Sequence, residues 1–330
     1  MRMNEFLSLD WGTSSFRLRL AAAGTGQVTD EEISDQGIAV TFREWQKEAN
    51  QAPAARLAFY THTIAAHLSA LEKRLNRSLA GLPLLVSGMA SSSIGLLELP
   101  YLTLPFAIDG SGIEPRQLPA TSDFPHDLYL ISGVRSENDV MRGEETQLIG
   151  GIPDGWNKDQ DGVFIFPGTH SKHMVVQGNQ VVAFKTYMTG EFFELLTKNS
   201  ILSATVAAPD SLQDRSGTAS FAKGVQEAVG TNLLHAAFLV RTNHLFGVWS
   251  REENFNYLSG LLIGTELQDL AQHPGVDLYL FGGARLQPYY EQALALLGLG
   301  QQVRSFPARW VDEAVIRGQA RIRQQLTRKQ

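Results

Sequence analysis

Hydrophobic and polar residues near the N-terminus follow the pattern of two adjacent strands. Residues 6–10 form a short, mostly apolar run that ends at Asp10, and the small residues 12–15 follow it. Over residues 16–20, apolar side chains then alternate with Arg17 and Arg19. Alternation with a period of two is typical of a strand that is buried on one face. The pattern therefore predicts a strand, a tight turn and a second strand.

The rest of the first half predicts a long helix and two further strands. Ile64, Leu68, Leu71 and Leu75 recur at helical spacing, which predicts an amphipathic helix from about residue 53 to 79. Residues 84–86 and 128–131 are apolar runs typical of buried strands, and a Ser-Gly pair directly follows each run. Five prolines between positions 100 and 125 predict an irregular excursion, which is typical of a binding loop.

The second half repeats this order. Residues 163–166 predict a strand, residues 168–171 a turn, and residues 174–176 and 181–184 two more strands. Residues 278–281 predict a later strand, which two glycines and a helical run follow. Near the C-terminus, four residues at helical spacing predict a last helix: Val311, Val315, Gly318 and Ile322. The repetition predicts an α/β protein of two similar domains. The polar stretch with Gly and Pro at 150–162 places the boundary between residues 1–152 and 153–330.

Composition narrows the class of protein. The chain has 330 residues, long enough for two domains, with 43% hydrophobic and 19% charged residues. Its net charge of −6 argues against nucleic acid or an anionic membrane as a partner. The absence of Cys excludes disulfides, thiolate metal sites and a Cys nucleophile. No apolar run is long enough for a signal peptide core or a membrane span, so we predict a cytoplasmic protein, and a homo-oligomer remains open.

The two predicted turns share the pattern Gly-Thr-x-Ser. Gly12 and Thr13 begin the first turn, and Gly168 and Thr169 begin the second. Backbone N–H groups converge in such a turn, and hydroxyl groups add donors, so each turn is suited to a phosphate. Either turn alone is explained as well by an ordinary hairpin. Their repetition at matching positions favours phosphate binding, and Asp10 beside the first turn would hold Mg²⁺ or cap the turn.

Competing motifs fit the sequence poorly. No P-loop pattern occurs, and residues 24–26 lack the spacing of a dinucleotide fingerprint. Residues 157–162 resemble the start of a calcium loop, but the twelfth position holds Gly168 in place of Glu. His170 and His173 have no nearby carboxylate or Cys in the sequence, which argues against a metal site.

A charged stretch over residues 135–147 contains the candidates for acid–base chemistry. Asp139 and Glu144 are each suited to accept a hydroxyl proton during phosphoryl transfer. Acidic residues also favour a helix N-terminus, which is the better account of Glu145. Arg135 and Arg142 would pair with a substrate carboxylate or neutralise these acids. Arg17 has the same two interpretations. Arg17 and Arg19 are also explained as the solvent-facing side of a strand, which is the better account of Arg19.

The turns, Asp10 and the late Gly-Gly pair resemble the actin-like ATPase superfamily, which includes many sugar kinases. Four runs, in order along most of the chain, resemble the signatures of the 2-dehydro-3-deoxygalactonokinase family: Asp10-Trp11-Gly12-Thr13-Ser14-Ser15-Phe16-Arg17, Ser87-Gly88-Met89-Ala90-Ser91-Ser92-Ser93-Ile94-Gly95, Met141-Arg142-Gly143-Glu144-Glu145-Thr146-Gln147 and Pro167-Gly168-Thr169-His170-Ser171-Lys172-His173.

This resemblance implies two actin-like (ribonuclease H-like) domains with mixed sheets flanked by helices and an interdomain cleft. It also implies ATP and Mg²⁺ as cofactors, and phosphorylation of the terminal 6-hydroxyl of 2-dehydro-3-deoxy-D-galactonate in galactonate breakdown. The implied ATP residues are Asp10, Gly12, Thr13, Ser14, Gly168, Thr169, Ser171, Gly282 and Gly283. The implied sugar-acid residues are Ser87, Gly88, Met89 and Ser91, with Arg17, Arg135 and Arg142 as candidates for the carboxylate.

Related kinases usually carry the general base in an Asn-Asp pair at the start of the helix after the last strand of the first domain. Here that place holds residues 141–145, with Asn138-Asp139 slightly earlier, so the base remains open between Asp139 and Glu144. Three other functions remain open: a kinase for a related sugar acid, an actin-like nucleotide switch, and a catalytically silent sugar-sensing module.

Overall fold

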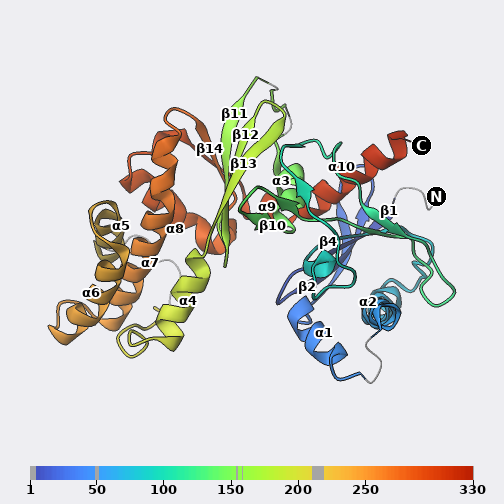
Figure 1. Cartoon of the computed structure of the whole chain (residues 1–330), viewed down its shortest axis with the longest axis horizontal. Coiled ribbons are helices and arrows are strands. Elements are labelled where there is room, and N and C mark those ends of the chain that lie inside the picture. The colour runs from blue at the N-terminus through green and yellow to red at the C-terminus, as the bar shows by residue number, and fades with distance from the viewer. Residues whose placement is uncertain (1–4, 49–51, 154, 158, 210–218, 330) are drawn as a thin grey trace. The chain divides into compact units, whose positions relative to one another are not determined.

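The chain folds into two compact units (Figure 1). The computed structural model describes residues 5–48, 52–153, 155–157, 159–209 and 219–329. Unit 1 contains the described residues of the spans 1–158, 179–182 and 312–330, and unit 2 contains those of 159–178 and 183–311.

In unit 1, strands come before and after two helices in the sequence, and the last helix of the chain also belongs to this unit. Its elements are β1 (Glu5–Trp11), β2 (Phe16–Ala22), β3 (Val28–Ser34), α1 (Ile38–Trp45), α2 (Pro53–Leu75), β4 (Leu84–Gly88), η2 (Met89–Ser91), β5 (Leu102–Thr103), β6 (Phe106–Ala107), β7 (Arg116–Leu118), β8 (Leu128–Leu130), β9 (Val134–Arg135), β10 (Val140–Met141), α3 (Glu144–Gly151) and α10 (Ala314–Lys329).

Unit 2 has a group of helices between its third and fourth strands. Its elements are β11 (Asp161–Phe166), β12 (Ser171–Gln177), β13 (Gln180–Tyr187), α4 (Thr189–Asn199), α5 (Ala219–Gly230), α6 (Leu233–Leu245), α7 (Arg251–Leu267), η3 (Gln268–Gln272), β14 (Asp277–Leu280), α8 (Gly283–Leu296), η4 (Gly300–Gln302), β15 (Val303–Ser305) and α9 (Ala308–Asp312). The first residues of β13 are assigned to unit 1, where they pair with β6.

The main sheets of the two units share one topology. The strand order is β3-β2-β1-β4-β8 in unit 1, with β7 at the edge, and β13-β12-β11-β14-β15 in unit 2. In each sheet the first two strands are antiparallel, and the later strands run parallel to the first. This is the strand order of the ribonuclease H-like, or actin-like, fold. The predicted fold class and the internal repetition are therefore confirmed.

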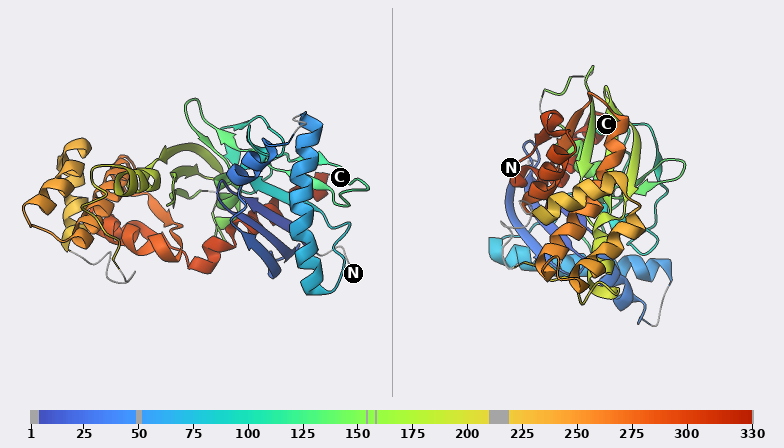
Figure 2. Two further views of the ribbon diagram at one scale, coloured as in Figure 1. Left: turned by 90° about the horizontal axis from the view of Figure 1, so that it is seen from below. Right: turned by 90° about the vertical axis from the view of Figure 1, so that its left-hand side faces the viewer.

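The sheet of unit 1 is covered on both faces. On one face α2 packs against the sheet (Figure 2), and its Ile64 and Leu68 lie in one core with Leu9 and Leu18. On the other face, Ile316 of α10 packs with Phe6 and Leu85. Both faces of β1 are thus excluded from solvent, which explains why its residues 6–9 are all buried.

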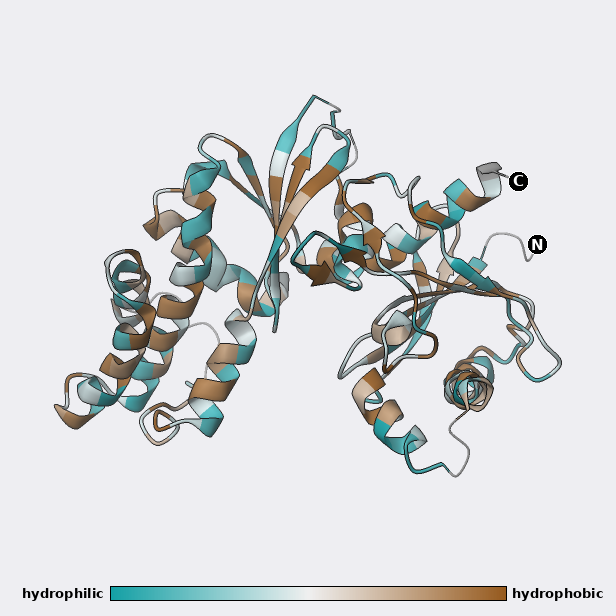
Figure 3. Cartoon of the chain, viewed as in Figure 1, coloured by the Kyte–Doolittle hydropathy of each residue, from teal (hydrophilic) through white to brown (hydrophobic). Residues whose placement is uncertain are grey.

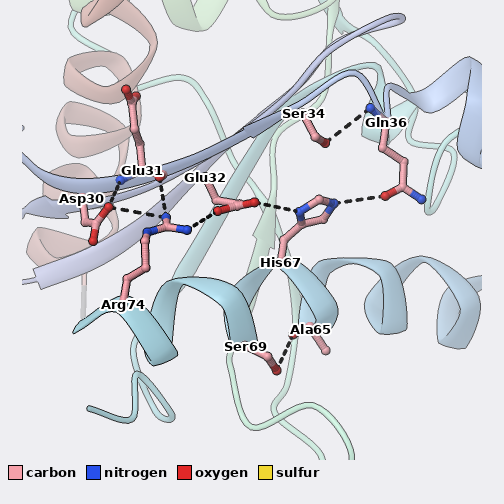
Figure 4. A network of polar contacts seen from close by, with 9 residues as sticks. All are labelled: Asp30, Glu31, Glu32, Ser34, Gln36, Ala65, His67, Ser69 and Arg74. Carbon is pink, nitrogen blue, oxygen red and sulfur yellow. Dashed lines mark hydrogen bonds and ion pairs between the residues drawn. The ribbon is translucent and has the colours of Figure 1, made fainter. Parts of the chain in front are cut away.

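A polar network joins α2 to the edge strand β3 (Figure 4). Arg74 pairs with Glu32 at 2.5 Å and with Asp30 at 3.4 Å. His67 lies between Glu32 and Gln36, with its Nε2 3.0 Å from Gln36 Oε1. Because Gln36 directly precedes Gly37 and α1, this network also fixes the segment that leads into α1.

Strands β11 and β14 of unit 2 turn aliphatic side chains to one face of the sheet and aromatic side chains to the other. Val163, Ile165 and Leu280 pack with residues of α5, α7 and α8. On the opposite face Phe164 stacks on Tyr279 with ring centroids 4.6 Å apart, and Phe166 stacks on Phe281 at 4.7 Å. The β11–β12 hairpin is accordingly hydrophobic along its middle and hydrophilic at its tip (Figure 3).

Several predicted boundaries differ from the structure. Residues 312–329 pack in unit 1 and not in the second domain, because α10 supplies the apolar cover of β1 and β4. The helix predicted to reach residue 79 ends at Leu75, where Asn76 adopts the left-handed conformation. The predicted irregular excursion carries the short strands β5, β6 and β7. In the described part of the chain, no helix is long and apolar enough to cross a membrane.

Candidate active site

The first predicted phosphate turn is held from both sides. Within the turn, the N–H of Gly12 donates to Ser15 O at 2.9 Å. The first N–H groups of α1, from Ile38 and Ala39, donate to the carbonyl oxygens of Gly12 and Thr13, each at 3.0 Å. The side chains of Thr13 and Ser14 remain exposed. The turn is thus fixed by its backbone while its hydroxyl groups face solvent.

Asp10 lies at the end of β1 between two neighbouring strands. Its cross-strand partners are Arg17 on β2 and Ser87 on β4. Although a fifth of its side-chain surface is exposed, burial of the carboxyl group raises its pKa. Arg17, with Nη1 3.6 Å from Oδ2, opposes this shift, and Glu144 reinforces it. Asp10 is therefore a carboxylate whose charge is incompletely neutralised by the protein.

Two glycines bring the start of α3 to Asp10. Gly88 has φ +85°, and a Cβ there would lie 3.3 Å from Asp10 Oδ1. Gly143 has φ +103°, and its Cβ would lie 3.3 Å from Gly88 Cα. Glu144, the first residue of α3, follows directly. The backbone contacts therefore place Asp10, Gly88 and Glu144 in one cluster.

The two glutamates at the start of α3 differ in burial. Glu144 is half-buried, and its carboxylate accepts a hydrogen bond from the N–H of Arg142 at 3.1 Å. Glu145 is buried and accepts from the N–H of Gly143 at 2.8 Å and from the Thr146 hydroxyl at 2.9 Å. Burial, with a smaller contribution from Glu144, raises the pKa of Glu145 to about 7. Glu145 is thus the inward partner of the pair.

Arg142 ties the start of α3 to the predicted sugar-acid segment. Its Nη1 donates to Ser91 O at 2.6 Å and to Ser91 Oγ at 2.8 Å, and its Nε donates to the Tyr101 hydroxyl at 3.2 Å. The guanidinium also lies over the Tyr101 ring, 4.0 Å from its centroid. These contacts give Arg142 a structural role that the sequence did not predict.

The other residues of the predicted sugar-acid segment lie at the end of β4 and in η2. Ser87 is buried, and its hydroxyl accepts a hydrogen bond from Gln319 of α10 at 2.9 Å. Met89 is half-buried in η2. Ser87 is therefore held from within unit 1.

Arg135 and Asp139 line a separate pocket of about 310 Å³ in unit 1. Tyr101 and residues 136–140 complete its lining. Asp139 accepts a hydrogen bond from the N–H of Val140 at 2.7 Å. Within the described parts of the chain, the exposed guanidinium of Arg135 makes no ion pair or hydrogen bond. The structure thus groups Asp139 with Arg135, and Glu144 with Asp10.

The second predicted phosphate turn, in unit 2, repeats the construction of the first. The N–H of Glu191 in α4 donates to Thr169 O at 3.1 Å, as α1 does to the first turn. A Cβ at Gly190 would lie 2.6 Å from Gly168 O, and one at Gly37 would lie 2.4 Å from Thr13 O. Each turn is therefore in close contact with a glycine at the start of the helix that follows the third strand.

The side chains of the second turn point in two directions. Thr169 and His170 are exposed, whereas Ser171, the first residue of β12, is buried. Ser171 Oγ accepts from the N–H of Gly168 at 3.3 Å and lies 3.1 Å from the Tyr290 hydroxyl. His170 pairs with Glu191 at 2.5 Å, and His173 lies 2.9 Å from Glu266.

Gly282 and Gly283 lie where β14 leads into α8. Gly283 has φ +60°, and a Cβ at this position would meet nothing within 4 Å. A Cβ at Gly282 would lie 2.6 Å from Gln287 Cα, so Gly282 is required for the first turn of α8 to pack. Gly283 presents bare backbone to open space, which suits the close approach of a ligand.

The residues present fit ATP and Mg²⁺. A Cβ at Gly168 would meet only His170 N, at 4.0 Å, so the second turn offers open backbone to a phosphate. Asp10, at the end of β1 beside the first turn, supplies a hard oxygen ligand of the kind that Mg²⁺ prefers.

Sequence reasoning did not identify Gly37, Gly190, Glu266 or Tyr290. Gly37 and Gly190 each lie between the third strand of a sheet and the next helix, an arrangement that only the structure shows. Glu266 and Tyr290 lie in helices far along the chain from the turn, and only the folded structure brings them to Ser171.

The duplicated actin-like fold carries a Gly-Thr turn in each unit and a carboxylate beside the first, an arrangement suited to a phosphotransferase. Residues 10–322 match the 2-keto-3-deoxy-galactonokinase family, and the chain belongs to this family.

Similar proteins agree with this assignment. A protein of Rhizobium meliloti (strain 1021) assigned as a 2-dehydro-3-deoxygalactonokinase is 33% identical over 95% of this chain and 94% of its own length. The 2-dehydro-3-deoxygalactonokinase of Escherichia coli (strain K12) is 29% identical over 89% of this chain and 90% of its own. A crystal structure of a protein assigned to the same activity, from Sinorhizobium meliloti, has a TM-score of 0.77 at 30% identity and covers 97% of this chain and 96% of that chain.

Proposed function

We propose that the protein is an ATP-dependent kinase that phosphorylates the 6-hydroxyl of 2-dehydro-3-deoxy-D-galactonate, in galactonate breakdown. The relatives that match nearly the whole chain are assigned this activity. The single observation that carries the proposal is the cluster of Asp10, Gly88 and Glu144 beside the first Gly-Thr turn. It combines a ligand for a metal, an approach for phosphate and a second carboxylate for the hydroxyl proton.

ATP and Mg²⁺ are assigned to the duplicated turns. Gly12, Thr13 and Ser14 with Asp10 would hold phosphate and Mg²⁺, Gly168 and Thr169 a second phosphate, and Gly282 and Gly283 the adenosine. Mg²⁺, when bound, neutralises negative charge on the phosphates and on the group being transferred. The exposed hydroxyl groups of both turns and the bare backbone at Gly283 support this assignment.

Glu144 is the proposed general base. A base has to reach the hydroxyl that attacks the γ-phosphate, so it belongs beside the phosphate and metal residues. Glu144 is near enough to Asp10 to affect its pKa, whereas Asp139 lines the pocket with Arg135. Asp139 would then lie near the other end of the sugar acid.

Arg135 is the proposed partner of the substrate carboxylate. Arg142 already donates to Ser91 and Tyr101, and Arg17 faces Asp10. The guanidinium of Arg135 is exposed at the 310 Å³ pocket and is suited to bind a carboxylate with two parallel hydrogen bonds. Met89 and Ser91, with Ser87 and Gly88 behind them, would border the sugar between Arg135 and Glu144.

A coupled assay for ADP release tests the proposal against its alternatives. The protein is supplied with ATP and Mg²⁺ and a panel of 2-dehydro-3-deoxy sugar acids, with galactose as the neutral control. We expect ADP release that requires the galactonate derivative. ADP release without any sugar would indicate a nucleotide switch, and no release with any sugar would indicate a sensing module. Preference for another acid of the panel would assign a related sugar-acid kinase. A cytoplasmic location and a homo-oligomer remain predictions.

A further inference from the structure

A buried polar network lies directly behind the second Gly-Thr turn. The carboxylate of Glu266, from α7, is 2.7 Å from the Tyr290 hydroxyl of α8 and 2.9 Å from His173 Nε2 of β12. The oxygen that accepts from Tyr290, Oε2, also accepts from the Thr189 hydroxyl at the start of α4, whereas His173 lies at Oε1. Glu266, Tyr290 and His173 are all at least 95% buried. Neither the fold nor the proposed reaction accounts for a buried carboxylate here.

The hydrogen-bond directions in this network follow from the donors available. Glu266 as a carboxylate can only accept, so Tyr290 donates its hydroxyl proton to Glu266. Tyr290 then has only its oxygen lone pairs left for Ser171, 3.1 Å away, so the Ser171 hydroxyl donates to Tyr290. Burial raises the pKa of Tyr290 well above its usual value, which keeps the phenol protonated. The one proton of the Ser171 hydroxyl is therefore committed to the interior.

Phosphate oxygens at neutral pH accept hydrogen bonds, so a serine whose proton points inward has none to donate to them. Ser171 Oγ meanwhile accepts from the N–H of Gly168, the residue that begins the turn. Ser171 Oγ therefore joins the backbone of the turn to the buried Tyr290 and does not face solvent.

We propose that Ser171 is a positioning residue that fixes the second phosphate turn, and that Tyr290 and Glu266 hold it there. In this arrangement Ser171 acts through Gly168, and the phosphate is bound by the turn's backbone and Thr169. The inference rests on the proposed use of this turn for ATP. It changes the role of Ser171 from a ligand to a support.

Glu266 supports the turn on two sides. Glu266 is linked through Tyr290 to Ser171, the first residue of β12. It is also linked through Thr189 to α4, whose Glu191 N–H donates to Thr169 O. A single buried carboxylate therefore sets the spacing between the strand and the helix that enclose the turn. Tyr290, Thr189 and His173 all lie within hydrogen-bond distance of Glu266, so its buried oxygens have partners.

The first test measures the turn without any nucleotide. Hydrogen–deuterium exchange is followed in a peptide spanning residues 167–171 for the unmodified protein, Tyr290→Phe and Tyr257→Phe. Tyr257 is the matched control, since it is also buried in unit 2 and donates to Ala236 O, away from the turn. We expect faster exchange of the peptide in Tyr290→Phe only. Equal exchange in all three proteins would overturn the inference. If Tyr290→Phe does not fold, Ser171→Ala replaces it.

The second test separates support from direct binding by a double-mutant cycle. Calorimetry gives the Kd of Mg·ADP for Ser171→Ala, Tyr290→Phe and the double variant. Loss of a hydrogen bond should raise the Kd about 3- to 10-fold in each single variant, and Ser171→Ala should add little once Phe replaces Tyr290. Ser171→Thr, which keeps the hydroxyl, should restore affinity. Independent, multiplying effects would assign Ser171 as a phosphate ligand and overturn the inference.

The two tests keep the inference distinct from the proposed function. If the unmodified protein does not bind Mg·ADP while exchange in Tyr290→Phe increases at the turn, the kinase assignment fails and the support of the turn stands. If Mg·ADP binds and neither variant changes exchange or affinity, the support of the turn is wrong and the kinase assignment stands.

Discussion

Gly88 and Asp10 lie so close that a single methyl group would fill the space between them. A Cβ at position 88 would be 3.3 Å from Asp10 Oδ1 and 2.8 Å from Trp11 O, on a backbone with φ +85°. We expect Gly88→Ala to lower the free energy of unfolding by about 1–3 kcal/mol because of backbone strain. It should also lower kcat, since the methyl group displaces Asp10.

The control for this substitution is Gly81→Ala. Gly81 has φ +84°, but a Cβ there would meet nothing within 4 Å. Thermal unfolding should show a loss of stability in both variants, and the kinase assay a loss of activity in Gly88→Ala alone. Equal activity of the two variants would contradict the role of this contact.

Glu144→Gln and Asp139→Asn distinguish the two candidate bases. If Glu144 accepts the hydroxyl proton, Glu144→Gln should lower kcat by about 10²–10⁴ and leave the affinity for Mg·ADP unchanged. Asp139→Asn should retain most of the kcat, because Asp139 lines the pocket with Arg135. Steady-state kinetics with both substrates saturating measure this difference. The reverse result would assign the base to Asp139.

Glu145 should make stability depend on pH. Its pKa is about 7 in the folded protein against 4.5 for the free side chain, so the folded state holds its proton more tightly. The free energy of unfolding should therefore fall as pH rises from 4.5 to 7, by about 3 kcal/mol at most, and then level off. Because Gln does not titrate, Glu145→Gln should lack this part of the pH dependence. Parallel Tm curves for both proteins between pH 5 and 8 would refute the assignment.

Arg135→Ala should raise the KM for the sugar acid about tenfold or more, since it removes a charged hydrogen-bonding partner, and leave the KM for ATP nearly unchanged. Arg116→Ala is the matched control, because it removes another exposed arginine of unit 1, on β7. Galactose lacks the carboxylate, so any residual activity toward it should be equal in both variants. A sugar-acid KM that Arg135→Ala leaves unchanged would place the carboxylate elsewhere.

The sequence was informative where the signal is local. The run before Asp10, the two Gly-Thr turns and the alternation at residues 16–20 depend on near neighbours, and the structure has a strand, turn and strand in both places. The repeat of this pattern was enough to predict the fold class. The duplication of Gly37 and Gly190, in contrast, becomes visible only when each turn is seen against its helix.

Long-range contacts account for what could not be predicted. Arg142 was a candidate for the substrate carboxylate because it lies near the predicted site in the sequence, but its partners Ser91 and Tyr101 lie 51 and 41 residues away. The helical spacing at the C-terminus predicted a helix correctly and placed it in the wrong domain. Nothing in that spacing indicates that Gln319 donates to Leu9 O and Ser87 Oγ, more than 230 residues earlier.

The position of α10 has a consequence for synthesis of the protein. Unit 2 ends at residue 311, whereas unit 1 also contains residues 312–329, so α10 leaves the ribosome after all of unit 2. The ribosome therefore delivers every residue of unit 2 before the chain that completes unit 1. Until then Phe6 and Leu85 lack their cover from Ile316. The N-terminal half of the chain, although made first, is the last to be able to close its core.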